Sequence, residues 1–118
     1  YGEAGVDEIH GLDGDDFIQG GEGNDKIYGG GGNDDLFGVF GANEIYGGLG
    51  DDHIVGGEGG DKLYGEAGVD EIHGGDGDDE IRGGAGNDTL TGNAGGDHIY
   101  FETGDTVNSD TADTLIPE

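Results

Sequence analysis

Residues 20–28 read GGEGNDKIY, and the segment that follows at 29–37 reads GGGGNDDLF. The same arrangement returns as GGLGDDHIV at 47–55 and as GGEGGDKLY at 56–64. Each segment has glycine at its first, second and fourth positions, aspartate at its sixth and an aliphatic residue at its eighth. A period this short and this regular predicts a solenoid, in which each repeat is one structural unit stacked on its neighbours.

The composition alone is typical of a disordered chain. The 118 residues include 29 Asp and Glu but only 3 Lys and Arg, for a formal charge of −26, and 30% of them are hydrophobic. Too little apolar surface is present to offset the entropy of folding, so the repeats indicate a state that folds only with a cation. Nucleic acid is excluded as a partner because its phosphates would be repelled. No run is long enough to span a membrane, and without cysteine no disulfide can form.

The repeat region has clear limits. Cutting at every ninth residue from Gly2 gives eleven repeats without gaps, ending at Tyr100. Positions one and four are always Gly, position eight is always Ile or Leu, and position six is Asp in every repeat except the fifth, which has Asn43. We therefore expect two segments: a repeat domain at 1–100 and a non-repeat segment at 101–118 that caps the C-terminal end of the solenoid.

The repeat predicts an all-β fold. We expect three residues around position eight to form a short strand, with position eight inward and positions seven and nine outward. The six residues before them are expected to form a turn, where glycine permits positive φ. With two repeats per coil, the eleven repeats predict a parallel β-roll solenoid of about 5.5 coils.

The core of such a solenoid is thin. Burying one aliphatic side chain per repeat contributes about 1.5–3 kcal/mol, whereas ordering each residue of the repeat costs roughly 1–2 kcal/mol of backbone entropy. Apolar burial is therefore insufficient, and the acid-rich turns are the candidates for the missing stabilisation. Ca²⁺ takes about six to eight oxygen ligands from carboxylates and carbonyls. One turn supplies half of such a shell and the turn two repeats along supplies the rest, so each ion would connect consecutive coils.

The pattern GGxGxDxUx, where U is a large aliphatic residue, resembles the nonapeptide of the repeats-in-toxin (RTX) family. The resemblance covers residues 2–100. It implies a parallel β-roll with calcium in the turns, in a bacterial protein that a type I machinery exports unfolded from a calcium-poor cytosol. In that family the ligands are the position-six carboxylates and the carbonyls of positions one to four.

Carried over onto this chain, the resemblance implies two stacks of aspartate ligands and a set of glycine carbonyls. The aspartates are Asp7, Asp25, Asp61, Asp79 and Asp97 in one stack, and Asp16, Asp34, Asp52, Asp70 and Asp88 in the other. The glycines are Gly20, Gly21, Gly23, Gly29, Gly30, Gly32, Gly47, Gly48, Gly50, Gly56, Gly57, Gly59, Gly74, Gly75, Gly77, Gly83, Gly84 and Gly86. Adjacent turns form nine pairs, two of which include Asn43, so we expect seven to nine calcium ions.

We therefore expect a secreted, extracellular calcium-binding module, not an enzyme, that supports type I secretion and folding of a larger protein. Because the chain starts with Tyr1, the residue type that ends other repeats, we expect neighbouring domains in a longer chain. One alternative is a carbohydrate-binding accessory module for a polysaccharide, and another is a passive spacer of an adhesin.

The outward positions carry the residues on which the alternatives depend. A row of tyrosines at position nine could stack on sugar rings or pack on itself: Tyr28, Tyr46 and Tyr64. The histidines are expected to be solvated and not catalytic, since no nucleophile accompanies them: His10, His53, His73 and His98.

Overall fold

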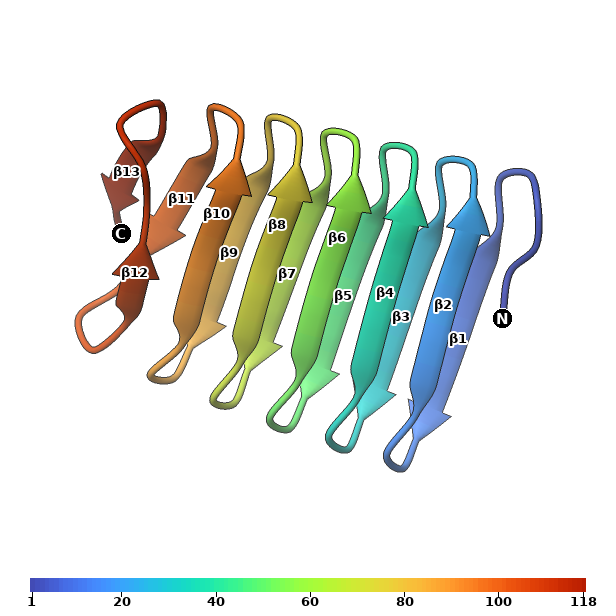
Figure 1. The fold of residues 1–118 in the computed structure, drawn as a ribbon. Helices are drawn as coiled ribbons and strands as arrows, with labels where there is room; N and C mark the ends of the chain where they lie inside the picture. The colour runs from blue at the N-terminus through green and yellow to red at the C-terminus, as the bar shows by residue number, and fades with distance from the viewer.

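The computed structural model describes residues 1–118, and its regular elements are thirteen β-strands. The strands are β1 (Glu8–Asp13), β2 (Phe17–Glu22), β3 (Lys26–Gly31), β4 (Asp35–Phe40), β5 (Glu44–Leu49), β6 (His53–Glu58), β7 (Lys62–Ala67), β8 (Glu71–Asp76), β9 (Glu80–Ala85), β10 (Thr89–Ala94), β11 (His98–Phe101), β12 (Thr106–Asn108) and β13 (Thr114–Pro117). Odd-numbered strands form a seven-stranded sheet and even-numbered strands a six-stranded sheet, which lie as two layers (Figure 1). All pairings are parallel, which confirms the predicted all-β parallel solenoid.

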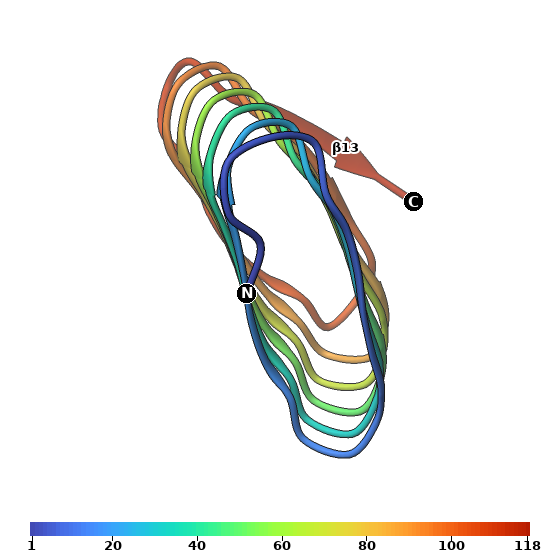
Figure 2. The ribbon, with the colours of Figure 1, turned by 90° about the vertical axis from the view of Figure 1, so that its right-hand side faces the viewer.

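Two repeats complete one coil, as the sequence predicts. Seen along the solenoid axis, the chain follows a flattened oval whose long sides are the two sheets (Figure 2). Ile9 pairs with Ile27, and Ile27 pairs with Ile45, so each residue lies beside its equivalent two repeats along. Equivalent positions therefore form straight rows along the solenoid.

The strands are longer than the three residues expected from the sequence. Strands β1 to β10 each have six residues, comprising positions seven to nine and the first three positions of the next repeat. The turns have only three residues, such as 32–34. The expectation was wrong because the first glycines continue the parallel ladder: Gly30 pairs with both Leu12 and Gly48. Flat sides and tight corners result.

The core contains one side chain per repeat. Position eight is at most 5% exposed in every repeat after the first, and Ile9 of the first repeat packs against this core. The buried residues are Ile18, Ile27, Leu36, Ile45, Ile54, Leu63, Ile72, Ile81, Leu90 and Ile99. The inward orientation of position eight is confirmed. Positions one and six are also inward, which brings the aspartates into the interior.

Glycine serves two different purposes in the repeat. At position four it has positive φ throughout, as at Gly23 with φ 127°, a conformation that costs little without a Cβ. At position one φ is ordinary but space is lacking: a Cβ on Gly20 would lie 2.6 Å from Asp25 Oδ2 and 2.9 Å from the Gly38 carbonyl oxygen. The constant glycine at position one therefore reflects the close approach of both the aspartate of its own repeat and the backbone of the next coil.

Position two is where the repeat tolerates strain. Its glycines have positive φ, and four of the five other residues found there share that conformation: Leu12, Val39, Glu66 and Asn93, but not Glu3 of the first repeat. A β-branched side chain is least suited to it, so Val39 on β4, with φ 86°, makes repeat five the most strained repeat.

The segment after Tyr100 continues both sheets. Strand β12 pairs with β10, and β13 pairs with β11. Val107 lies beside Leu90, and Leu115 beside Ile99, so aliphatic residues continue the rows of position eight. That the segment acts as a cap stays a prediction.

Space at position one can be tested with two alanine variants. Gly20→Ala should lower the free energy of unfolding of the calcium-loaded protein by about 1–3 kcal/mol, because the methyl group meets oxygen atoms on two sides. Gly31→Ala is the matched control, since its Cβ would find only Asp13 Oδ1, at 3.7 Å, and the change should stay within about 1 kcal/mol. Denaturant unfolding of both variants measures the difference. Equal destabilisation would show that close approach does not explain the position-one glycine.

Candidate metal centres in the turns

The position-six aspartates form two buried ladders, one along each row of turns. From Asp25 to Asp97 this position is at most 2% exposed. Each Oδ1 accepts a hydrogen bond from the backbone N–H of the equivalent residue one coil earlier: Asp16 N–H donates to Asp34 at 2.8 Å, and Asp34 N–H donates to Asp52 at 2.8 Å. The carboxylates therefore connect consecutive coils even without an ion.

The second carboxylate oxygen has no such partner. Nine buried Oδ2 atoms accept no hydrogen bond, and they belong to Asp16, Asp25, Asp34, Asp52, Asp61, Asp70, Asp79, Asp88 and Asp97. An unpaired buried charge is strongly unfavourable, so native proteins pair such groups or coordinate a metal with them. The same atom in nine of the eleven repeats thus favours a positive partner.

A carbonyl oxygen of the next coil approaches the same space as the unpaired oxygen of Asp25. Asp25 Oδ2 and the carbonyl oxygen of Gly38, in the next coil, both approach the point where a Cβ on Gly20 would lie, at 2.6 and 2.9 Å. Two acceptors that converge without a donor between them fit a cation. Hard cations such as Ca²⁺ prefer carboxylate and carbonyl oxygens. The residues present therefore fit calcium, with the position-six carboxylates and position-one carbonyls as its candidate ligands.

Burial makes the charged form of these carboxylates unfavourable in the ion-free fold. It raises the pKa of Asp52 and Asp61 to about 6 and the pKa of Asp70 and Asp79 to about 7. The backbone N–H from the preceding coil opposes this shift, but loss of solvent is the larger cause. Charged aspartates thus destabilise the fold until a cation neutralises them.

Repeat five has no buried charge at position six, because Asn43 replaces the aspartate. Asn43 Oδ1 accepts the N–H of Asp25 at 2.9 Å, as an aspartate would. Its Nδ2 donates to the carbonyl oxygens of Gly41 and Phe40, at 3.3 and 3.5 Å. The amide therefore places a donor where other repeats have an unpaired acceptor, which leaves this turn without a need for a cation.

Two aspartates after the repeats join the same ladders, and the sequence analysis missed them. Asp105 Oδ1 accepts the N–H of Asp88 at 3.0 Å, and Asp113 Oδ1 accepts that of Asp97 at 3.1 Å. The nine-residue period and its glycines are lost there, but the triplets DTV at 105–107 and DTL at 113–115 keep positions six to eight. That triplet was the available signal.

The structure brings the sequence-predicted aspartates together in two continuous rows. Asp7, at the exposed N-terminal coil, differs, because its Oδ2 accepts the N–H of Glu3 at 3.2 Å. Some of these carbonyls also accept backbone hydrogen bonds, as where Gly14 N–H donates to the Gly31 carbonyl at 2.7 Å and Glu22 N–H to the Glu3 carbonyl at 2.9 Å, and each keeps a second lone pair. The glycine carbonyls stay the candidates that the family resemblance implies.

The outer tyrosine row packs on itself. Tyr28 stacks on Tyr46 with ring centroids 5.1 Å apart, and Tyr46 stacks on Tyr64 at 4.9 Å. His10 stacks on Tyr28, and the Arg82 guanidinium lies 3.7 Å from the centre of the Tyr100 ring. Neighbouring side chains cover the ring faces that a sugar would need, so this arrangement favours self-packing over sugar stacking.

Comparison with known families agrees with this geometry. The model of the RTX calcium-binding nonapeptide repeat, which describes four copies at a time, matches residues 1–36, 37–72 and 73–107. This chain belongs to that RTX family. Its turns are thus those of a calcium-binding β-roll module, and the last match includes Asp105, beyond the strict period. No curated protein matches the sequence significantly. The RTX module has no helix long and apolar enough to cross a membrane.

Restoring a carboxylate in repeat five should create an ion site. Asn43→Asp replaces the Nδ2 donor with an acceptor, so calcium should bind more tightly, with about one further ion, and should fold the chain at a lower concentration. Asp79→Asn is the matched control and should raise that concentration, because it removes a charge from a complete stack. Calcium titrations followed by circular dichroism measure all three proteins. An unchanged or higher midpoint for Asn43→Asp would instead implicate the strained backbone of Val39.

Protons should partly replace calcium in the ion-free chain. Folded carboxylates with a raised pKa bind more protons than unfolded ones, so the stability of the ion-free fold increases as the pH falls through about 6–7. In excess chelator, β-structure seen by circular dichroism should therefore increase across that window. If it increases only below about pH 4, where ordinary carboxylates titrate, general loss of charge is responsible and the buried aspartates are not.

Proposed function

We propose that this RTX module is a calcium-dependent folding unit of a larger secreted protein, unfolded during type I export and folded by Ca²⁺ outside the cell. The observation that supports it is the set of nine buried carboxylate oxygens without a hydrogen-bond partner. The fold that buries them is unfavourable while they stay charged, and calcium supplies the partner. Binding and folding are then one event.

The overall negative charge of the chain also favours folding only when cations are bound. At −26, self-repulsion favours the expanded chain. One divalent ion for each unpaired oxygen would bring the charge to about −8. We propose seven to nine ions, held in two rows by the position-six aspartates and the glycine carbonyls of consecutive coils.

The calcium affinity suited to this role is low. Extracellular calcium modules bind with dissociation constants of about 10⁻⁴–10⁻³ M, which leaves them empty in a calcium-poor cytosol. An unfolded acidic chain is compatible with passage through a narrow export channel. Calcium outside would then fold it, and the folded module would help its neighbouring domains to fold.

Calcium removal tests the proposal. In chelator at neutral pH, circular dichroism should show a coil, and millimolar Ca²⁺ should restore β-structure with a steep midpoint. Mg²⁺ at equal concentration is the control and should be much less effective, since it demands a tighter octahedral shell. Native mass spectrometry of the loaded protein should give seven to nine ions. A β signal that persists in chelator would refute coupled folding, and fewer than five bound ions would refute the pairing of turns.

A further inference from the structure

A second group of potential metal ligands lies away from the turns, on the outer face of the six-stranded sheet. It consists of His53 on β6 with Glu71 and His73 on β8. One ring nitrogen of each histidine and a carboxylate oxygen of Glu71 all lie within 4.8 Å of one another. His53 is paired in register with Glu71, and His73 follows two residues later on the same face. The parallel register thus places the three side chains together.

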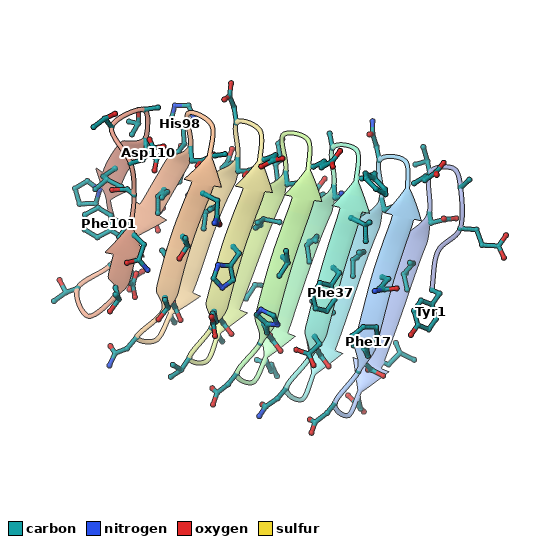
Figure 3. The ribbon with its side chains drawn as sticks, viewed as in Figure 1. Tyr1, Phe17, Phe37, His98, Phe101 and Asp110 are labelled. Carbon is teal, nitrogen blue, oxygen red and sulfur yellow. The ribbon has the colours of Figure 1, made fainter.

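Neighbouring groups hold these side chains in place. His53 Nδ1 lies 3.2 Å from Asp35 Oδ1, which leaves Nε2 of that ring for another partner. His73 Nε2 lies 2.9 Å from Glu71 Oε1. The two imidazoles meet edge to face, with centroids 5.9 Å apart, and Phe37 packs edge to face against His53 at 5.7 Å. Phe37 lies on the outer face of β4 (Figure 3). The histidine side chains are 38% and 31% exposed, so the group is accessible but supported.

We propose that His53, Glu71 and His73 bind a divalent transition-metal ion of the Zn²⁺ type. Imidazole nitrogen with carboxylate oxygen is a ligand set that zinc accepts, whereas calcium prefers oxygen alone. Zinc ligands at about 2.0–2.1 Å lie roughly 3.3 Å from one another in a tetrahedral shell. Rotamer changes of these partly exposed side chains would have to close the remaining gap. A water molecule completes the shell.

Asp35 has the position of an orienting residue. A carboxylate that accepts the second ring N–H of a metal-bound histidine fixes its tautomer and increases its basicity, and the contact between Asp35 and His53 Nδ1 is of that kind. The strongly acidic surface also concentrates cations near the group. The three side chains and the acidic surface around them therefore both favour binding of a metal cation.

The chain contains its own control for this site. The segment EIHG of β8 occurs identically at residues 8–11 in β1. There His10 Nε2 lies 2.8 Å from Glu8 Oε1, the same local pair as His73 and Glu71. That pair lies on the other sheet, where His10 stacks on Tyr28 and no second histidine is near. An isolated histidine–glutamate pair can thus be compared with the complete group in one molecule.

Zinc titration of the calcium-saturated full chain tests the proposal. Isothermal calorimetry in excess Ca²⁺, which occupies the oxygen sites, should detect one Zn²⁺ bound more tightly than any other. His53→Asn and His73→Asn should each weaken that binding about tenfold or more, and Asp35→Asn should weaken it less. His10→Asn should leave it unchanged. The circular dichroism of each variant in calcium verifies that it folds, as expected for changes on an outer face.

Spectroscopy provides a readout that does not depend on calorimetry or on the variants. Cu²⁺ bound to the wild-type chain should show hyperfine coupling to two imidazole nitrogens. Coupling to one nitrogen only, no zinc binding in excess calcium, or equal weakening by His10→Asn and His73→Asn would each overturn the site. Such results would show that His53 and His73 are members of an ordinary ion-pair and aromatic ladder.

Discussion

The buried carboxylate at position six is the group on which the structure depends. One oxygen accepts a backbone N–H from the preceding coil, and the other is buried without a hydrogen-bond partner. The first contact sets the register between coils, because it can form only between equivalent positions two repeats apart. The second creates a demand for positive charge that recurs in nearly every turn. Register and the proposed ion binding thus depend on the same side chain.

The aliphatic core has a secondary role. One buried Ile or Leu per repeat keeps the two sheets together, but its contribution is small compared with the entropy of ordering nine residues. Parallel sheets normally gain stability from helices that cover both faces, and this chain has none. Its glycines allow the coils to approach closely at position one, which brings carboxylate and carbonyl oxygens within reach of a shared cation. Close approach, together with the ion binding that we propose, therefore replaces the large core.

The sequence predicted the features that depend on the nine-residue period and missed those that do not. Two repeats per coil and the inward Ile or Leu follow from period and alternation. Strand length could not be predicted, since Gly30 and its equivalents suit a turn and a ladder equally well by residue type. Burial of Asp70 could not be predicted either, because it results from the tight corner between flat sides. The group of His53, Glu71 and His73 depends on diagonal contacts across strands, which the period shows only once the register is known.

The ends of the ladders show how a solenoid of buried charges can terminate. No coil follows the last aspartate of each ladder. A charged second oxygen there would have an ion site with ligands from one coil only. Asp105 Oδ2 accepts the N–H of Glu102 at 2.7 Å, and Asp113 Oδ2 accepts that of Asp110 at 2.8 Å. Backbone donors from a local turn thus take the place that we propose for a cation in the interior coils. The sequence after Tyr100 has few glycines, and its turns place a backbone N–H close to the carboxylate. No coil follows these turns, so they do not have to present carbonyl oxygens to an ion shared with a further coil. The demand for cations therefore ends where the nine-residue period ends.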